Sequence, residues 1–452
     1  MRVTSRVGGG MGLCSCYDAE EISEKISRKF SEKFLEKVEK LIPLGSQTFS
    51  KSKTQYPIGI SPLFALRAKG SNLWDIDGNK FIDLVNSLAA ITLGYNNKKV
   101  NRAVISQVKK GSIFSLPDQI EFRVAELISS LIPSAEMVRF GKNASDATTA
   151  AIRLARFYTN RDLVITCGYH GWQDWSIGIT TQNNGIPKSV IQNTKTFKFN
   201  DIESLKKIFG DYQNQIAAVI IEPINSELPK NGFLEDVLNL TKLNGAISIF
   251  DETVTGFRVH KAGAQGLFNL KPDLSIFGKG IANGYPLSVL VGKREIMKEM
   301  DKIFFSTTFG GEMVSLSAAE AVLKILIYDD FTKTLADKGK YLSNEIEKLI
   351  LERGLESRIR FSGHDSWRFI NWRENSDYSN AEMCTYFLQE MFEKGLLVLN
   401  SHNVSCAITK RQLDKVIEIY DDFFDKFEHD LESNNLKQKL KVRPLVPLFK
   451  IR

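Results

Sequence analysis

The chain has 452 residues, of which 43% are hydrophobic and 25% are charged, a profile typical of a globular protein with more than one domain. Its 60 basic and 53 acidic residues leave a formal charge of only +7, and basic residues cluster only in the tail 437–452, so nucleic acid is not an expected partner. No apolar run approaches the length of a bilayer crossing, so we expect no membrane association either.

Residues 1–20 lack the apolar core of a secretory signal and are predicted to be a disordered N-terminus. Met11 within them is an alternative start of translation. The stretch contains two of the five cysteines, Cys14 and Cys16, and the other three are scattered along the chain. An odd number of scattered cysteines argues against a disulfide framework and against a metal site, and it indicates a reducing cytoplasm.

Residues 21–90 are predicted to form an N-terminal segment with one helix and one hairpin. Apolar residues recur at helical spacing in "EISEKISRKFSEKFLEKVEKLI", residues 21–42, which indicates an amphipathic helix that packs on its own chain or on a partner subunit. The later stretch "SNLWDIDGNKFIDL" has two apolar runs around Asp77 and Gly78, which is typical of a β-hairpin with a tight turn.

Residues 91–328 are predicted to be a large domain in which helices alternate with short apolar strands. This alternation indicates an α/β fold with a mostly parallel sheet and helices on both faces. Residues 329–436 are predicted to be a smaller α+β domain, with a long helix, short strands around "SWRFINW" and "LLVLN", and a final helix "RQLDKVIEIYDDFFDKF". The predicted strands of the large domain are 137–141, 163–167, 216–223, 246–252, 273–279 and 287–292.

Polar or aromatic residues that are able to take part in catalysis or binding follow five successive strands of the predicted sheet. Open α/β sheets bind ligands beyond the carboxyl ends of their strands, so five such ends at one edge describe a site. In chain order these ends carry "KNASDATTAAIRLAR", "GYHGWQDW", Glu222-Pro223, Asp251-Glu252 and Gly278-Lys279.

Three of the first four ends suit different parts of one ligand. Asn143 and Ser145 can cap a helix whose free N–H groups would bind a phosphate, although a plain helix cap is the commoner outcome. Asp251 ends an apolar strand, where a carboxylate needs a cationic partner such as a protonated pyridine nitrogen. Tyr169 offers a flat ring for stacking, whereas His170 is more often a structural hydrogen-bonder.

Lys279 at the fifth end completes the set, because a lysine amine is able to form a Schiff base with an aldehyde. Its neighbours Gly278 and Gly280 are small and leave room for a cofactor ring. A phosphate site, a stacking ring, a partner for a pyridinium nitrogen and an amine together predict pyridoxal 5′-phosphate (PLP) as the cofactor, with no metal.

The sequence also resembles a known family. The stretches "IIEP…IFDETVTGFRV…GAQGLFNLKPDLSIFGKGIANGYP", "AAIRLARFYTNRD", "GYHG" and "STTFGGE" are similar to the class III aminotransferases, PLP enzymes of fold type I, and within them to the glutamate-1-semialdehyde aminomutase branch. The similarity runs over residues 40–330 and more weakly to about residue 425. It implies a mostly parallel sheet of the seven-stranded type and a smaller α+β domain.

The resemblance implies a role for each matching residue. Lys279 matches the Schiff-base lysine, which also moves the proton between the substrate Cα and the cofactor. Thr308 matches a threonine that reaches the phosphate of the neighbouring subunit, which implies a homodimer with shared active sites. The remaining matches are Asp251 to the pyridinium partner, Tyr169 to the stacked residue, Asn143, Ala144 and Ser145 to the phosphate turn, and His170 and Glu222 to residues near the cofactor.

Departures from the aminomutase pattern fall on the substrate side. Lys51 stands where the aminomutases place an arginine for the substrate carboxylate, and lysine is a point charge without the bidentate geometry of arginine. Leu88 replaces a tryptophan, and Glu312 replaces an asparagine. The phosphate turn reads Asn-Ala-Ser at 143–145 in place of Ser-Gly-Thr. We therefore expect a substrate other than glutamate-1-semialdehyde.

Four functions stay open at this point. The first is an aminotransferase that uses an amino-acid donor and a carbonyl acceptor, such as a keto-sugar or a small keto compound. The second is an intramolecular aminomutase, the third a racemase or epimerase on the same cofactor, and the fourth a non-catalytic protein that uses the scaffold to bind a partner. Arg368, Arg373 and His402 are either substrate ligands or structural residues, and the chain forms a dimer or a tetramer.

Overall fold

The computed structural model describes residues 26–446. The predictions for residues 1–20, with Cys14, Cys16 and Met11, lie outside the described residues, as do the first part of the helix predicted at 21–42 and the end of the tail. The described part of that helix is α1 (Lys29–Val38). It ends before the predicted boundary because the chain turns ahead of Pro43, and Ile42 is extended, as a residue before proline prefers.

The first sheet combines three strands from the N-terminal part of the chain with one strand from its C-terminal part. The predicted hairpin is confirmed as β2 (Asn72–Asp75) paired antiparallel with β3 (Lys80–Asp83), and Gly78 in its turn has a φ of +90° that favours glycine. β1 (Ala65–Lys69) pairs with β2, and β13 (Leu396–Leu397) pairs in parallel with β3. β13 is the predicted "LLVLN" strand, so this strand belongs to the N-terminal sheet rather than to the smaller domain.

The central sheet has seven strands in the order β4-β10-β9-β8-β7-β5-β6. β10 is antiparallel to both of its neighbours and the other pairs are parallel, so the predicted mostly parallel sheet is confirmed. The strand at one edge, β6, has only three residues and no apolar run, which is why the sequence did not indicate it. The strands are β4 (Met137–Gly141), β5 (Leu163–Cys167), β6 (Thr194–Thr196), β7 (Ile216–Ile221), β8 (Ile247–Glu252), β9 (Leu274–Phe277) and β10 (Ser288–Gly292).

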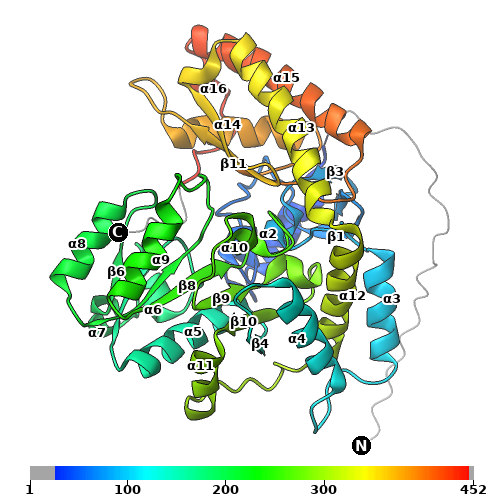
Figure 1. The fold of residues 1–452 in the computed structure, drawn as a ribbon. Helices are drawn as coiled ribbons and strands as arrows, with labels where there is room; N and C mark the ends of the chain where they lie inside the picture. Colours follow the sequence, from blue (N-terminus) through cyan, green and yellow to red (C-terminus); the bar gives the residue numbers. More distant parts are fainter. Residues whose placement is uncertain (1–25, 447–452) are drawn as a thin grey trace, which may run out of the picture.

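Helices cover both faces of this sheet (Figure 1). Alternate residues of β5, β7 and β8 point to opposite faces. One set packs with α5 in one apolar cluster, and the other packs with α8 and α9 in a second cluster. A third and larger cluster lies under α4 and α12 and continues into the C-terminal part of the chain. The longer helices are α3 (Lys98–Val108), α4 (Gln119–Leu131), α5 (Ala144–Thr159), α8 (Ile202–Asp211), α9 (Phe233–Leu243) and α12 (Met313–Asp329).

Short helical segments connect these elements. None of the helices within residues 26–446 combines the length and the hydropathy that a bilayer crossing demands. The short α-helices are α2 (Asn86–Ala89), α6 (Asp174–Ile177), α7 (Lys188–Gln192), α10 (Gly263–Leu267) and α11 (Arg294–Met297), and the 3₁₀ helices are η1 (Pro43–Gly45), η2 (Phe49–Lys51), η3 (Lys279–Ala282), η4 (Lys298–Lys302) and η5 (Leu355–Ser357).

A smaller sheet domain, which we call the small domain, follows α12 and is drawn from yellow to red in Figure 1. It contains the antiparallel sheet β11-β12-β14, whose middle strand is the predicted "SWRFINW" strand. The domain boundaries at 329 and 436 stay predictions. Its elements are α13 (Phe331–Glu352), β11 (Ile359–His364), β12 (Trp367–Trp372), α14 (Asn380–Glu393), β14 (Ser401–Asn403), α15 (Lys410–Glu432) and α16 (Leu436–Lys439).

Candidate active site

The predicted site residues of four neighbouring strands lie at one edge of the central sheet. Tyr169 follows β5, Glu222 follows β7, Asp251 lies near the end of β8, and Lys279 follows β9. The backbone N–H of Tyr169 donates to Glu222 Oε2 at 3.0 Å, which links the first two of these strand ends. Parallel strands that are adjacent in the sheet bring their carboxyl ends together, and this is why residues so far apart in sequence meet here.

Asp251 is buried and its carboxylate is held on both oxygens. Oδ2 is 2.8 Å from His170 Nδ1, and Oδ1 accepts from the Thr253 backbone N–H at 3.1 Å and from Thr253 Oγ1 at 2.5 Å. Burial alone raises the pKa of Asp251, but the hydrogen bonds from His170 and Thr253 outweigh burial and hold the pKa below its usual value. The site therefore keeps a negative charge at the end of an apolar strand.

His170 is fully enclosed and holds Asp251 in place. Because a carboxylate only accepts, Nδ1 carries the proton of the 2.8 Å bond. The ring stacks on Trp175 at a centroid distance of 6.3 Å, and the His170 carbonyl accepts from Thr148 Oγ1 of α5 at 2.8 Å. The interpretation of His170 as a structural hydrogen-bonder agrees with these contacts, and its partner is the predicted site carboxylate.

Glu252, the neighbour of Asp251, has a structural role. Alternation along β8 turns it to the opposite face of the sheet, where it is fully buried. It accepts from Thr255 Oγ1 at 2.6 Å and from the backbone N–H groups of Ala264 and Gln265 at 2.6 and 3.0 Å. The sequence predicts a site role for Asp251 and none for Glu252, although both follow the same apolar run.

Lys279 combines a strained backbone with a pKa that favours the neutral amine. Its φ of 42° lies in the left-handed region, which a non-glycine residue adopts at a cost. Burial lowers the pKa of its amine, against the opposing charges of Glu222 and Asp251. A neutral amine is the nucleophilic form, so a lowered pKa increases the share of the Lys279 amine that is able to react with a carbonyl.

The two glycines beside Lys279 have different surroundings. A Cβ on Gly280 would lie 3.0 Å from Thr92 Cγ2, so this glycine lets the lysine loop approach Thr92 closely. A Cβ on Gly278 would meet Thr253 Cγ2 at 3.4 Å, which is ordinary contact. Gly280 thus has a packing reason of its own, and the expectation that both glycines leave room for a cofactor ring stays a prediction.

The predicted phosphate turn lies at the start of α5. The Asp146 carboxylate accepts from the backbone N–H groups of Lys142 and Asn143 at 3.1 and 2.8 Å, and Asn143 is the N-cap residue. Gly171 has a φ of +109°, and a Cβ there would lie 2.6 Å from Ser145 Cβ. Only glycine therefore allows the loop that carries Tyr169 and His170 to reach the first turn of α5, where N–H groups are available to an anion.

Thr308 and Glu312, two other predicted site residues, do not follow strands of the central sheet. Thr308 lies on an exposed loop that is tied to the body by Arg139 Nη2 at 3.0 Å from the Phe305 carbonyl. Glu312 caps α12 by accepting from Val314 and Ser315, and it pairs with Lys142 Nζ at 2.9 Å. Both contacts hold Glu312 in a structural position beside the phosphate turn.

Lys51 is the last residue of η2 and is exposed. Its Nζ donates to Ser87 Oγ at 3.3 Å. Leu88, which replaces the tryptophan of the aminomutases, packs partly buried against the large core.

The three residues left open in the small domain have structural partners. Arg368 Nη2 is 3.1 Å from Asp365 Oδ1, and Arg373 Nη1 donates to the Glu356 carbonyl at 3.3 Å. His402 is buried and bonds to the hydroxyl of Tyr420. These contacts match the structural interpretation of the three residues.

The structure adds residues that the sequence had not indicated. Thr253, two positions after Asp251, binds its carboxylate in the manner of an Asx turn, which the pattern "DET" would have allowed us to suspect. Arg258 is fully buried and donates only to backbone carbonyls among its described contacts. No local sequence signal identifies such a residue.

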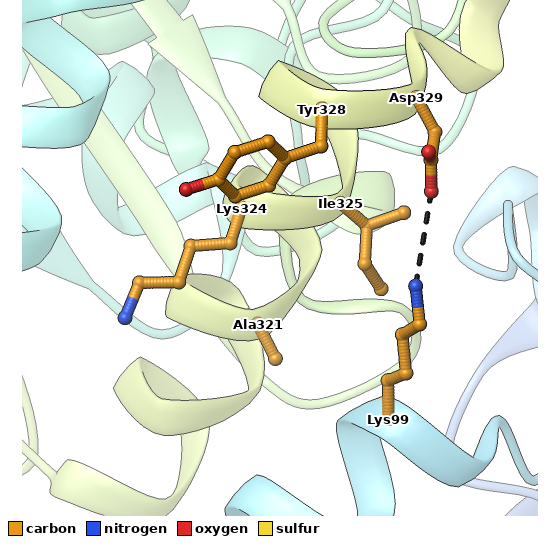
Figure 2. A pocket seen from close by; sticks show the side chains of 6 residues that line it. All are labelled: Lys99, Ala321, Lys324, Ile325, Tyr328 and Asp329. Atoms are coloured by element: carbon orange, nitrogen blue, oxygen red, sulfur yellow. Dashed lines mark ion pairs between the residues drawn. The ribbon is translucent and has the colours of Figure 1, made fainter.

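A separate pocket of about 350 Å³ lies between α3 and α12 (Figure 2). Its residues are Lys99, Ala321, Lys324, Ile325, Tyr328 and Asp329, with one exposed ion pair of 3.8 Å between Lys99 and Asp329. None of the strand-end residues lines this pocket, so it lies apart from the candidate active site.

The sequence over residues 56–424 matches the family Aminotransferase class-III. The chain belongs to this family. It is 34% identical to 3-aminobutyryl-CoA aminotransferase of Cloacimonas acidaminovorans, with 81% of this chain and 89% of that protein covered. It is 33% identical to glutamate-1-semialdehyde 2,1-aminomutase of Wigglesworthia glossinidia brevipalpis, with 84% and 94% covered.

Solved structures show the same fold. The PLP internal aldimine form of the FumI protein of Sphingopyxis sp. MTA144 superimposes with a TM-score of 0.83 at 26% identity, covering 89% of this chain and 97% of that one. A glutamate-1-semialdehyde aminomutase of Pseudomonas aeruginosa PAO1 in complex with PMP gives a TM-score of 0.78 at 20% identity, covering 88% and 94%. This class III aminotransferase is thus a PLP-dependent transaminase or aminomutase with fold type I.

The residues at the strand ends fit this cofactor. The structure offers an amine with a lowered pKa, a carboxylate held ionised, and a helix N-terminus reached by the same loop that carries an aromatic ring. These are the groups that an aldehyde, a pyridinium nitrogen, a phosphate and a ring face require.

Proposed function

We propose that this class III enzyme transfers an amino group from an amino-acid donor to a carbonyl acceptor other than glutamate-1-semialdehyde. The observation that carries the proposal is the buried Asp251, ionised by His170 and Thr253, in the same cluster as the Lys279 amine. We further propose that the enzyme works in the cytoplasm, as the scattered cysteines indicated.

In the proposed site different residues would hold different parts of the cofactor. Asp251 would hold the ring nitrogen of PLP, Lys279 its aldehyde, and Tyr169 the face of its ring. The first turn of α5, with Asn143, Ala144 and Ser145, would hold the phosphate. When bound, PLP supplies an electron sink for the electrons released at the substrate Cα.

Proton transfer and the control of charge in the site are the proposed roles of three side chains. The Lys279 amine, with its lowered pKa, would take the proton from the substrate Cα and move it between that carbon and the cofactor. His170 keeps Asp251 oriented and charged, so the positive charge opposite Asp251 persists while the proton moves. Burial raises the pKa of Glu222, which keeps a second carboxylate of the cluster closer to its neutral form.

The proposed homodimer rests on the exposed loop of Thr308 and on apolar side chains that stay uncovered in one subunit. Ile105 and Val108 of α3 and Phe309 of the same loop are 56%, 58% and 57% exposed. A partner that covers them would also bring its own Thr308 to this site. Light scattering should give twice the mass of one chain.

The experiment that tests the function is a visible absorption spectrum of the PLP-loaded protein before and after an amino donor is added. L-glutamate, L-alanine and 3-aminobutyrate form a suitable panel, the last because of the 3-aminobutyryl-CoA aminotransferase relative. We expect at least one donor to bleach the band, and a keto acid to restore it. A band that persists with every donor would favour the aminomutase, which the 33% identical relatives support.

Lys51 provides a prediction about the substrate. If its ammonium holds a substrate carboxylate, Lys51→Ala should raise KM for a carboxylate-bearing donor about tenfold or more, the size of a lost hydrogen bond to a charged group. The value of kcat should change less, because binding is lost equally in ground state and transition state. Lys51→Arg is the matched control and should keep KM near that of the wild type. An unchanged KM in Lys51→Ala would remove Lys51 from the substrate site.

A further inference from the structure

The two oxygens of the Asp251 carboxylate have different numbers of partners. Oδ1 accepts two hydrogen bonds, from the backbone N–H of Thr253 at 3.1 Å and from Thr253 Oγ1 at 2.5 Å. Oδ2 has His170 Nδ1 at 2.8 Å as its described partner. Each carboxylate oxygen has two lone pairs, so Thr253 occupies Oδ1 and leaves one acceptor position on Oδ2.

The methyl group of Thr253 lies against the loop that carries Lys279. A Cβ on Gly278 would lie 3.4 Å from Thr253 Cγ2 and 3.5 Å from Ala144 Cβ, and both are ordinary contact distances. Gly278 directly precedes Lys279, and Ala144 is the first residue of α5. The segments that follow β4, β8 and β9 therefore converge around Gly278, and Thr253 is the contact that comes from β8.

The two contacts of Thr253 need both branches of its side chain. The hydroxyl binds the carboxylate, and the methyl packs beside the residue that precedes the amine. Serine lacks the methyl and valine lacks the hydroxyl, so neither is able to make both contacts. Because two heavy atoms on Cβ restrict χ1, the position of one branch also fixes the position of the other.

We propose that Thr253 is a positioning residue that directs the ring nitrogen of the cofactor to Oδ2 of Asp251 and holds this carboxylate in a fixed position relative to Lys279. This inference rests on the proposed function, in which Asp251 and Lys279 hold the ring nitrogen and the aldehyde. A carboxylate without the Thr253 hydroxyl would offer either oxygen to the ring. The aldehyde would then meet the amine in more than one position, and only one of these positions suits the reaction.

The titratable groups that face Asp251 come from the neighbouring strand ends. Tyr169 and His170 follow β5, Glu222 follows β7, and Lys279 follows β9. Burial raises the pKa of Asp251, and the hydrogen bonds first from His170 and then from Thr253 bring it below its usual value. Threonine is uncharged, so a substitution at 253 changes a hydrogen bond to Asp251 without changing any of these charges.

The hydroxyl is tested with pyridoxine 5′-phosphate, which has the ring nitrogen and the phosphate of PLP but no aldehyde, so its binding does not need the Lys279 amine. Its dissociation constant is measured against pH by tryptophan fluorescence of the cofactor-free protein. In Thr253→Val the pH below which affinity falls should rise by about one unit, a tenfold change in the proton affinity of Asp251. Thr253→Ser keeps the hydroxyl and should keep the wild-type profile. A wild-type profile in Thr253→Val would overturn the proposal.

Thr255→Val is the matched control. Thr255 Oγ1 donates to Glu252 Oε2 at 2.6 Å, so this variant removes the same kind of bond from the neighbouring carboxylate, which faces the other side of the sheet. Its urea midpoint should fall, because a buried hydrogen bond is lost, but its binding profile for pyridoxine 5′-phosphate should stay that of the wild type. The phosphate of the probe titrates alike in all variants, so differences between profiles report the carboxylate. Equal shifts in Thr255→Val and Thr253→Val would refute a specific role of Thr253.

The methyl group is tested with PLP itself, through the rate at which the visible band forms. Thr253→Ser should form the band about tenfold more slowly than the wild type, within the roughly 10²-fold that a misplacement of about 1 Å is able to cost. Thr253→Val keeps the methyl and should lie closer to the wild type at neutral pH. A wild-type rate in Thr253→Ser would show that the methyl does not position Lys279.

Neither measurement needs an amino donor, so the two proposals fail in different ways. If the wild type forms the band but no donor bleaches it, the proposed amino transfer is wrong, while the variants still decide on Thr253. If a donor bleaches the band and the Thr253 variants behave like the wild type in both measurements, the proposed function stands and the role of Thr253 is refuted.

Discussion

Replacing Lys279 by alanine should remove both the visible band of the bound cofactor and the activity. The amine is the nucleophile for the aldehyde and the base for the substrate Cα, and loss of proton transfer alone lowers a rate by about 10²–10⁴-fold. Absorption spectra and donor turnover measure the two losses. The exposed Lys261→Ala is the control and should keep both. A variant at 279 that kept the band would show that another amine carries the cofactor.

The same lysine should make the cofactor-free protein less stable at neutral pH. Burial lowers the pKa of Lys279, so the folded chain binds this proton less tightly than the unfolded chain does. The free energy of unfolding should therefore rise as pH increases from the lowered pKa toward the ordinary pKa of lysine, about 10.4.

Lys279→Met tests this linkage because it keeps the length of the side chain and removes the charge. Its urea midpoint without PLP should exceed that of the wild type at pH 7, and this difference should shrink at high pH. A difference that does not depend on pH would mean that the amine is not desolvated in the folded chain.

Replacing Asp251 by asparagine should lower kcat about 10²–10³-fold, the size of the effect when one pre-organised electrostatic group is removed. The amide is isosteric, and it still accepts from Thr253, but it carries no charge to hold a protonated ring nitrogen. Donor-dependent bleaching of the PLP band in single turnovers gives the rate.

The control for this substitution is Asp273→Asn. Asp273 binds Ser248 and pairs with Lys293 at 2.6 Å, so its loss should affect the urea midpoint but not the rate of the half-reaction. If Asp251→Asn reacted as fast as the wild type, the ring nitrogen would need no charged partner in this enzyme.

His170 acts through Asp251, and the pH profile separates its role from a merely structural one. The hydrogen bond from His170 helps to hold the pKa of Asp251 below its usual value. In His170→Leu this pKa should rise, so the acid limb of the rate profile should move to higher pH. His170→Asn keeps a side-chain donor, so its acid limb should lie between those of the wild type and of His170→Leu.

Much of the fold and of the cofactor side of the site was readable from the sequence. Short apolar stretches, five to eight residues long and separated by helical patterns, predicted six of the seven central strands, because burial on both faces of a parallel sheet requires such stretches. The ends of those strands carried Tyr169, Glu222, Asp251 and Lys279. Since parallel strands share one edge, their meeting followed from the topology alone.

The remaining features depend on contacts between residues far apart in the chain. The short strand β6 and the parallel pairing of β13 with β3 have no local pattern, because backbone bonds to a distant strand define them. The same holds for the contacts of Arg258, whose carbonyl partners lie in three separate segments.

The left-handed turn at 86–89 shows most clearly where local information ends. The sequence Asn-Ser-Leu-Ala contains no glycine, and only its asparagine is a residue that adopts a left-handed backbone readily. The sequence by itself determined the sheet and the residues at its edge, because periodicity and burial act locally along each strand. Only the tertiary structure decided the backbone of this turn, whose residues have φ values of 47° to 67°, since Asn403 and Arg258 hold it by hydrogen bonds against its own preference.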